Sequence, residues 1–251
     1  MTAIFFSDVH LIDGNSVKTK LFLRFLQENA SRFEKIYILG DLFDAWPGTN
    51  SFLVRSYRSV IQVLKRLVEE GHEIHYFEGN HDFCLGKFFS ENLGIKVHTD
   101  FAIEEIGGKR VYIAHGDLGN PKEMSYRVFR YVLRRREFQI LKSVVPQQWV
   151  HQISIRSSQI SRDYQERLAK TSMNRRDSRI RGVFRRTAER LFLKGCDVVV
   201  LGHTHLPDDL STIVSGRDCR YINVGDWVRH FTYLEFDGTQ FYTKTHPIKN
   251  L

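Results

Sequence analysis

Six short apolar runs, spaced along the chain, constrain the fold more than any other feature of the sequence. Each run is four residues long and rich in β-branched or aromatic side chains, which is typical of strands buried on both faces. The runs are Ala3–Phe6, Ile36–Leu39, Ile74–Phe77, Val111–Ala114, Val198–Leu201 and Tyr221–Val224. Helical patterns separate the early runs, roughly at Thr19–Glu28, Leu53–Glu70 and Lys87–Asn92. This alternation predicts an α/β fold with a mainly parallel sheet core.

Strand patterns lie closer together near the end of the chain. Two further runs, Phe231–Phe236 and Phe241–Thr245, follow the last of the six. A β-rich second half predicts two packed sheets with helices outside them. The chain has 251 residues, 42% of them hydrophobic. That is enough for one substantial core, so we expect a single domain over residues 1–251.

The sequence also indicates where the protein works. It has no apolar run long enough for a transmembrane helix, and its first residues lack the pattern of a signal peptide. Its three cysteines, Cys84, Cys196 and Cys219, are far apart and odd in number. They predict no disulfide framework, so we expect a cytoplasmic protein.

Residues 120–195 interrupt the rhythm of strands and helices. This segment holds 19 Lys/Arg and 6 Asp/Glu, a net charge of +13, whereas the whole chain carries +8. Phe129, Leu133 and Ile140 follow helical spacing among arginines, which predicts a basic helical insertion. The arginines either form a solvated face or bind anions such as phosphate, nucleic acid or an acidic membrane surface. Likewise, the apolar residues either form a small core of the insertion or line a lipid-binding groove.

Polar residues follow the predicted strands directly. Because ligands of α/β sheets bind at the carboxyl ends of the strands, these residues are expected to meet at one rim. They are Asp8 and His10, Asp41 in Gly-Asp-x-x-Asp, Asn80 in Gly-Asn-His-Asp, His115, and His203 and His205 in Gly-His-x-His.

This set of side chains predicts a metal centre. Imidazole nitrogen together with carboxylate and amide oxygen suits Mn²⁺, Fe²⁺ or Zn²⁺. Seven side chains exceed the needs of one ion and suit two ions that share a bridging aspartate. Taken singly, each piece has an ordinary explanation, since Asp41 could cap a helix and a histidine after a strand is usually a packing residue. Their common position at five strand ends favours the metal hypothesis.

These motifs, in this order, resemble those of the calcineurin-like metallophosphoesterases. The resemblance implies a double β-sheet sandwich flanked by helices and a hydrolase with two divalent metal ions, of which we expect Mn²⁺. It implies that Asp8, His10, Asp41 and His205 hold one metal. It implies that Asp41, Asn80, His115 and His203 hold the other.

A narrower resemblance is to the UDP-2,3-diacylglucosamine hydrolase family of lipid A biosynthesis. It rests on residues 37–46 (YILGDLFDAW), on residues 82–87 (DFCLGK) and on the insertion after His115-Gly116-Asp117. The resemblance implies that the insertion is a lid over an acyl-chain groove. It implies that the substrate is a nucleotide-linked glycolipid, cut at its pyrophosphate to UMP and 2,3-diacylglucosamine 1-phosphate. It also implies a position on the anionic inner face of the inner membrane. The substrate-binding candidates are Glu123, Tyr126, Arg130, Ser161, Arg162 and Arg167.

Two features separate this chain from the familiar pattern of that family. His81 stands where the family usually has Arg, and Ser161 is not followed by the family's Asn and Lys. We expect His81 to act on the phosphoryl group or leaving group, with Asp82 orienting it and keeping it protonated. Two other hypotheses remain open. The chain is either another phosphodiesterase or nuclease, although the insertion lacks the regular aromatic residues that bind nucleic acid, or a metal-free binding scaffold.

Overall fold

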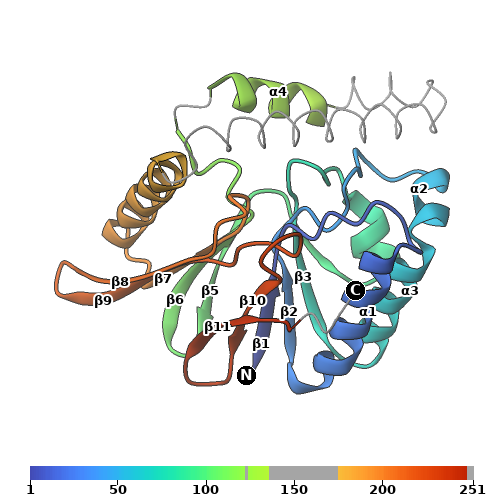
Figure 1. Ribbon diagram of the computed structural model, residues 1–251, viewed down its shortest axis with the longest axis horizontal. Coiled ribbons are helices and arrows are strands. Elements are labelled where there is room, and N and C mark those ends of the chain that lie inside the picture. Colours follow the sequence, from blue (N-terminus) through green and yellow to red (C-terminus); the bar gives the residue numbers. More distant parts are fainter. Residues whose placement is uncertain (122–123, 136–174, 248–251) are drawn as a thin grey trace.

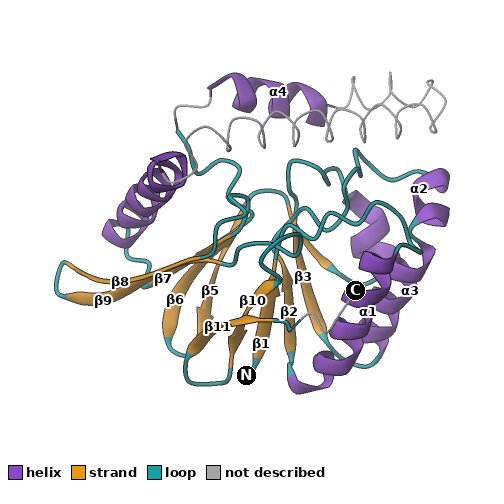
Figure 2. Cartoon of the chain, viewed as in Figure 1, coloured by secondary structure: helices purple, strands orange, loops and turns teal. Residues whose placement is uncertain are grey.

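The computed structural model describes residues 1–121, 124–135 and 175–247. Two β-sheets pack face to face, and helices cover the outer face of each sheet (Figure 1). The prediction of a two-sheet sandwich flanked by helices is confirmed. The loops that follow the parallel strands gather at one end of the sandwich (Figure 2). Among the described residues, no helix has both the length and the apolar character needed to cross a membrane.

The first sheet has the strand order β11-β10-β1-β2-β3-β4. Strands β1 to β4 are parallel, whereas β10 and β11 are antiparallel to their neighbours. The strands span Ala3–Phe6 (β1), Lys35–Ile38 (β2), Glu73–Phe77 (β3), Lys96–His98 (β4), Thr232–Phe236 (β10) and Phe241–Thr245 (β11).

The second sheet has the order β5-β6-β7-β9-β8. Here β6, β7 and β9 are parallel, and the outer strands β5 and β8 are antiparallel to their neighbours. The strands span Phe101–Ile106 (β5), Lys109–Ala114 (β6), Val198–Leu201 (β7), Asp208–Val214 (β8) and Arg217–Asn223 (β9). Of the last five strands of the chain, β7, β8 and β9 therefore belong to the second sheet and β10 and β11 to the first.

Apolar side chains form three layers of core. One layer, with Phe5, Phe77 and Ile113, fills the space between the sheets. A second packs the first sheet against the helices, and α3 alone buries five side chains at helical spacing. The third packs the second sheet against the helical residues 175–193 through Phe184 and Phe192. The helices and turns span Val17–Asn29 (α1), Ala30–Arg32 (η1), Ser51–Ser56 (α2), Arg58–Glu69 (α3), Phe88–Asn92 (η2) and Met124–Arg134 (α4).

The predicted helix Leu53–Glu70 is in fact two helices, α2 and α3, which meet at Tyr57. The Tyr57 hydroxyl donates to the carbonyl oxygens of Leu11 and Ile12 at 3.0 and 2.9 Å. The carbonyl of Ser56 accepts from the N–H of Gly14 at 2.8 Å. Contacts with the loop at residues 11–14 thus interrupt the helix at Tyr57. The periodicity of apolar residues does not reveal this interruption, because the contacts come from a distant part of the sequence.

The predicted insertion is described only at its two ends. The first end is α4, and the other is helical residues 175–193, of which Ala188 is fully buried against the second sheet. This second helix therefore packs as part of the body. The middle of the proposed lid, with Ser161, Arg162 and Arg167, lies outside the described residues, as does Glu123.

Candidate dinuclear metal centre

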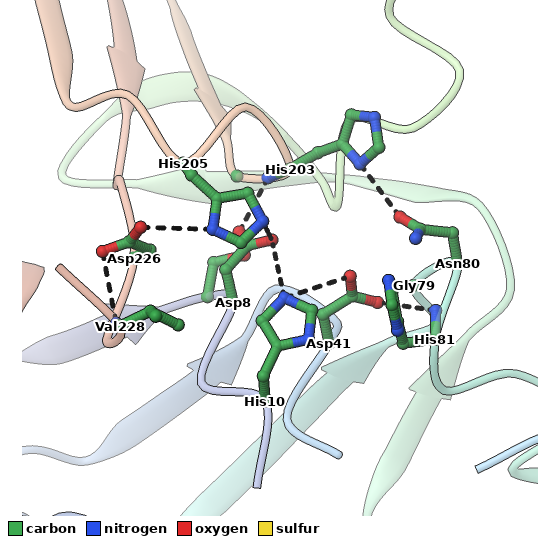
Figure 3. Close-up of polar contacts among 12 residues, drawn as sticks. Asp8, His10, Asp41, Gly79, Asn80, His81, His203, His205, Asp226 and Val228 are labelled. Atoms are coloured by element: carbon green, nitrogen blue, oxygen red, sulfur yellow. Dashed lines mark hydrogen bonds and ion pairs between the residues drawn. The ribbon is translucent and has the colours of Figure 1, made fainter. Parts of the chain in front are cut away.

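All seven predicted metal ligands meet at the rim where the parallel strands end, and Figure 3 labels six of them, all except His115. Asp8 and His10 follow β1, Asp41 follows β2, and Asn80 follows β3. His115 follows β6, and His203 and His205 follow β7. The two sheets therefore contribute to one site, as the pattern of polar residues at strand ends predicts.

Four of the ligand atoms form a compact group. Asn80 Oδ1 lies 3.0 Å from both His115 Nε2 and His203 Nδ1, and these two nitrogens are 3.2 Å apart. Asp41 Oδ2 lies 3.7 Å from His115 Nε2. Ligand atoms bonded at 2.0–2.1 Å to a tetrahedral ion lie about 3.3 Å apart. The spacing of this group therefore fits one metal ion.

A second group shares one atom with the first. Asp8 Oδ1 lies 3.3 Å from His205 Nε2 and 3.8 Å from His10 Nε2. His10 Nε2 lies 3.7 Å from Asp41 Oδ2, the same oxygen that faces His115. One oxygen of Asp41 thus borders both groups, which is the position of a bridging ligand.

Some buried polar atoms of the second group have no hydrogen-bond partner among the described residues. They are Asp8 Oδ1 and both ring nitrogens of His10. His10 Nδ1 is 3.4 Å from Asp44 Oδ1 but does not complete a hydrogen bond. Because buried polar atoms are normally satisfied, these atoms fit a bound cation.

Each carboxylate presents one oxygen to the site and uses the other as an anchor. Asp8 Oδ2 accepts from the N–H of His203 at 2.8 Å and from the Ser7 hydroxyl at 2.5 Å. Asp41 Oδ1 accepts from the N–H of His81 at 2.9 Å. The remaining oxygens, Asp8 Oδ1 and Asp41 Oδ2, are the ones that face the histidine nitrogens. These hydrogen bonds therefore fix which oxygen of each carboxylate faces the site.

Two of the histidines are oriented by acceptors on the side away from the site. His115 Nδ1 donates to the carbonyl of Leu39 at 2.7 Å. His205 Nδ1 lies 3.2 Å from Asp226 Oδ2, and Asp226 Oδ1 accepts three backbone N–H groups of residues 228–230. A proton on Nδ1 leaves the lone pair of Nε2 for a metal, as is usual for metal-bound histidine.

The backbone at the site adopts an unusual conformation. Among the described non-glycine residues with positive φ are Asp8, His10, Asp41, His203 and His205, with φ between 49° and 68°. This left-handed region costs roughly 1–2 kcal/mol per residue, and such strain collects at functional sites. Position 79 requires glycine for a steric reason, because a Cβ there would lie 2.0 Å from Asp41 Oδ1.

The electrostatics of the metal-free site favour a positive charge at its centre. Burial lowers the pKa of His10, but Asp44, Asp8 and Asp41 outweigh it and raise the pKa from 6.5 to about 10. Burial raises the pKa of Asp41, but the charges of His115, His81 and His10 lower it overall. A divalent cation would supply the charge that protons supply here, and its binding would release them.

Asp82 contacts the loop that carries Asp41. We expected it to orient His81 and hold it protonated. Its two carboxylate oxygens instead accept from the N–H groups of residues 41, 42, 43 and 79 and from the Tyr76 hydroxyl. Asp82 therefore fixes the loop that carries Asp41.

His81 is held by the backbone. Its Nδ1 donates to the carbonyl of Asp44 at 2.9 Å, and its ring meets that of His10 edge-on with centroids 4.7 Å apart. Burial lowers the pKa of His81 below 6.5, and the charge of His10 contributes. His81 is thus a neutral imidazole beside the two ligand groups.

Helix α4 carries the described part of the predicted substrate site. Arg130 contacts Asp117 at 3.0 Å and Asp100 at 2.7 Å. Arg134 binds Glu78 at 2.5 Å and the carbonyl of Gly79 at 3.3 Å. The arginines of this face thus attach α4 to the body beside the ligand Asn80. The side chain of Tyr126 lies outside the described residues.

Sequence reasoning gave no role to two carboxylates at strand ends, Asp44 and Asp226, that support the predicted ligands. Both are fully buried, and they face His10 and His205 respectively. Asp44 is the last residue of the Gly-Asp-x-x-Asp motif, and Asp226 follows β9 in the same way that the ligands follow their strands. Position at a strand end was the signal available for Asp226.

The chain is similar to a known protein family and to several known proteins. The family model described as calcineurin-like phosphoesterase matches residues 1–207. UDP-2,3-diacylglucosamine hydrolase of Stenotrophomonas maltophilia is 31% identical over 244 residues, covering 95% of this chain and 96% of that protein. The protein of the same name from Azotobacter vinelandii is 30% identical and covers 99% of this chain and 100% of its own length. A metallophosphoesterase structure from Sphaerobacter thermophilus has a TM-score of 0.42 and 14% sequence identity, covering 99% of this chain and 90% of that one.

Proposed function

The chain belongs to the calcineurin-like phosphoesterase family, and from this premise we propose that it hydrolyses the pyrophosphate bond of UDP-2,3-diacylglucosamine. The products are UMP and 2,3-diacylglucosamine 1-phosphate. Relatives that match over nearly the whole chain carry the name of this activity. The observation that carries the proposal is the meeting of seven metal-binding side chains at one rim, with Asp41 Oδ2 bordering both groups.

The site fits two divalent cations, for which we propose Mn²⁺. Asp8, His10, Asp41 and His205 would hold one ion, and Asp41, Asn80, His115 and His203 the other. The same donor atoms also suit Fe²⁺ and Zn²⁺. When bound, such a pair activates a water molecule and neutralises charge on the phosphoryl oxygens.

His81 is the group that we propose acts on the substrate beside the ions. Its Nδ1–H is held by the carbonyl of Asp44, so Nε2 is the atom at which a proton is held or moved. The approach of a negatively charged diphosphate favours the protonated ring. It can then donate to a phosphoryl oxygen or to the leaving group.

We propose that the insertion, residues 120–195, forms the lid over the lipid part of the substrate. Its described helix α4 lies above the rim (Figure 1) and is joined to Glu78 and Gly79 by Arg134. The substrate-binding assignments Glu123, Tyr126, Arg130, Ser161, Arg162 and Arg167 remain part of this proposal. Arg130 would act there in addition to its ion pairs with the body.

We also propose that the protein is cytoplasmic and binds the inner face of the inner membrane. Helix α4 exposes apolar side chains at helical spacing, namely Met124, Val128, Tyr131 and Val132. An apolar face flanked by positive charge suits an anionic lipid surface. Sedimentation with vesicles containing phosphatidylglycerol should carry down the protein but much less of a Val128→Glu variant. Equal sedimentation of both would contradict this surface.

A hydrolysis assay with Mn²⁺ tests the function. The panel compares UDP-2,3-diacylglucosamine with a generic aryl phosphate diester and with single-stranded DNA. We expect the glycolipid nucleotide to be cleaved to UMP, and Asp41→Ala or Asn80→Ala to abolish turnover. Preferential cleavage of DNA would make the protein a nuclease. Full activity of the Asp41→Ala protein would show that hydrolysis does not require the metal centre.

A further inference from the structure

A second meeting point of histidine and carboxylate lies away from the catalytic rim. His75 on β3, His98 on β4 and Glu104 on β5 face one another where the two sheets adjoin. His75 Nδ1 is 3.1 Å from His98 Nε2 and 2.9 Å from Glu104 Oε1. These separations approach the roughly 3.3 Å expected between ligands of a tetrahedral ion.

We propose that His75, His98 and Glu104 form a third metal site, separate from the dinuclear centre, that binds Zn²⁺ or a similar divalent ion. Two imidazoles and one carboxylate are a common zinc ligand set, with water in the remaining position. This site does not depend on the proposed function, because none of its three residues belongs to the catalytic rim.

The contacts of His75 indicate that a positive charge belongs at the centre of the cluster. His75 Nε2 lies 2.6 Å from Glu73 Oε1, so this nitrogen carries a proton. The lone pair of Nδ1 in neutral His75 would then point at the carboxylate of Glu104. Only a proton or a metal ion between the two makes this contact favourable. Metal-bound histidines typically donate their second ring N–H to a carboxylate. Glu73 has this position relative to Nε2 of His75.

Glu104 is oriented for the same purpose. Its Oε2 accepts from the Tyr37 hydroxyl at 2.6 Å and from Lys35 Nζ at 3.2 Å. The other oxygen, Oε1, is therefore the one directed at His75. Burial raises the pKa of Glu104, but hydrogen bonds from His75 and Tyr37 and nearby positive charge outweigh it and lower the pKa to about 2. The carboxylate is thus ionised throughout the physiological range.

His98 offers its nitrogen as a lone pair. Burial and the neighbouring His75 lower its pKa below 6.5, so the ring is neutral at pH 7. Its orientation is fixed by stacking on Phe77, with centroids 4.5 Å apart. His75 is 4% exposed and Glu104 18% exposed at the side chain, so the site is sheltered yet open to an entering ion on the Glu104 side.

A metal ion here would join both sheets. It would link β3 and β4 of the first sheet to β5 of the second. His75 lies five residues before Asn80, which is on the loop after β3. We therefore expect occupancy to stabilise the sandwich against unfolding.

The test counts bound Zn²⁺ in proteins that differ only at this cluster. Asp41→Asn protein, and the same protein with His98→Phe added, are dialysed against Zn²⁺ at equal free concentration and analysed for metal. Phenylalanine keeps the stacking on Phe77 but lacks the ligand nitrogen. We expect the added substitution to remove one equivalent of Zn²⁺. We also expect it to abolish the rise in melting temperature that Zn²⁺ gives. Because both proteins carry the same change at Asp41, the difference between them is independent of what the active site binds.

Two further variants complete the design. Glu104→Gln keeps an acceptor for Tyr37 and should weaken Zn²⁺ binding at this site at least tenfold. If His98→Phe does not fold, this variant decides alone. His72→Phe is the matched control, since His72 precedes the same strand and its ring contacts the carbonyl of Phe33, away from the cluster. Equal Zn²⁺ content and equal melting shifts with and without the cluster substitutions would show that a proton, and not a metal, occupies the site.

Discussion

Four side chains of the proposed metal centre are anchored by hydrogen bonds on the side away from the ions. Asp8 and Asp41 each give one oxygen to backbone N–H groups and keep one for the site. His115 and His205 are held from behind by Leu39 and Asp226. These anchors space the proposed ligand atoms for binding. Preorganisation of this kind limits the loss of entropy when the ions and the substrate bind.

Replacing His81 with alanine should slow the chemical step without emptying the site. We expect kcat to fall by about 100-fold, which is the scale of a lost proton-transfer group. The metal content should be unchanged, because His81 is not among the proposed ligands. The measurement is kcat at saturating substrate together with elemental analysis. A variant that keeps kcat within twofold of the parent would show that His81 does not act on the substrate.

Asp226→Asn should weaken metal binding rather than catalysis at saturating metal. Loss of a carboxylate behind a metal-bound histidine typically costs 10–100-fold in metal affinity. We expect a shift of this size in the Mn²⁺ concentration that gives half-maximal activity, with kcat largely restored at high Mn²⁺. Asp237→Asn is the matched control, since Asp237 accepts similar N–H groups in an exposed turn. Equal shifts in the two variants would contradict a role through His205.

The convergence of the seven proposed ligands could be predicted from the sequence, but their supporting contacts could not. Motif order and position at strand ends marked Asp8, Asp41 and the histidines, because the carboxyl ends of parallel strands must meet at one rim. The partners of Asp82 and Asp226 depend on loops folded against each other. Adjacency in the sequence led us to place Asp82 behind His81, whereas the Asp41 loop supplied donors that satisfied it better.

At the scale of elements, two helical segments from the ends of the insertion attach to the body through ion pairs. Helix α4 uses Arg130 and Arg134, and the helical residues 175–193 use Arg181 and Arg185 on Asp208 of β8. The apolar side of α4 is left exposed, whereas residues 175–193 bury theirs on the second sheet. The two attachments therefore differ in strength, and α4 is the one that depends on charge.

Arg134→Gln should loosen α4 above the rim. We expect the KM for the glycolipid nucleotide to rise about tenfold, equivalent to about 1.4 kcal/mol. Hydrolysis of a small aryl phosphate diester, which needs no lid, should change little. Arg24→Gln provides the control, because Arg24 forms an exposed ion pair within α1. Parallel losses on both substrates would place Arg134 in the catalytic step and contradict its role in α4.

Asp208→Asn should make stability less sensitive to acid. Burial raises the pKa of Asp208, but Arg185 and Arg181 outweigh it and lower the pKa below 3.8. The ionised pair therefore stabilises the fold above pH 3.8, and this contribution is lost as the pH falls further. We expect the variant to lose about 1–2 kcal/mol at pH 7 and progressively less below pH 4. Urea unfolding at pH 7 and pH 3 measures this, and an equal loss at both values would contradict the ion-pair account.

The strands that sequence patterns did not predict are β4, β5 and β8. All are edge strands or neighbours of an edge with partly exposed side chains, so they lack the continuous apolar run by which central strands were found. The central strands were placed to within a few residues. Burial on both faces therefore explains why the central strands were predicted, and the mostly exposed edge strand β11 was predicted as well.

The whole molecule is a sandwich whose two sheets share one active rim. The first sheet supplies Asp8, His10, Asp41 and Asn80, and the second supplies the three remaining histidines. Neither sheet alone provides the full set of proposed ligands for either ion, so the proposed metal centre requires correct packing of the two sheets. The same packing brings His75 and Glu104 together at the proposed third site.

Anomalous X-ray diffraction from crystals grown with Mn²⁺ is the sharpest test of the dinuclear metal centre. We expect two manganese peaks roughly 3.5–4 Å apart, on either side of Asp41 Oδ2. One peak should lie beside His10 and His205, and the other beside Asn80 and His115. Two peaks at these positions would establish the dinuclear centre. A fully ordered rim with no manganese peak at these ligands would contradict it.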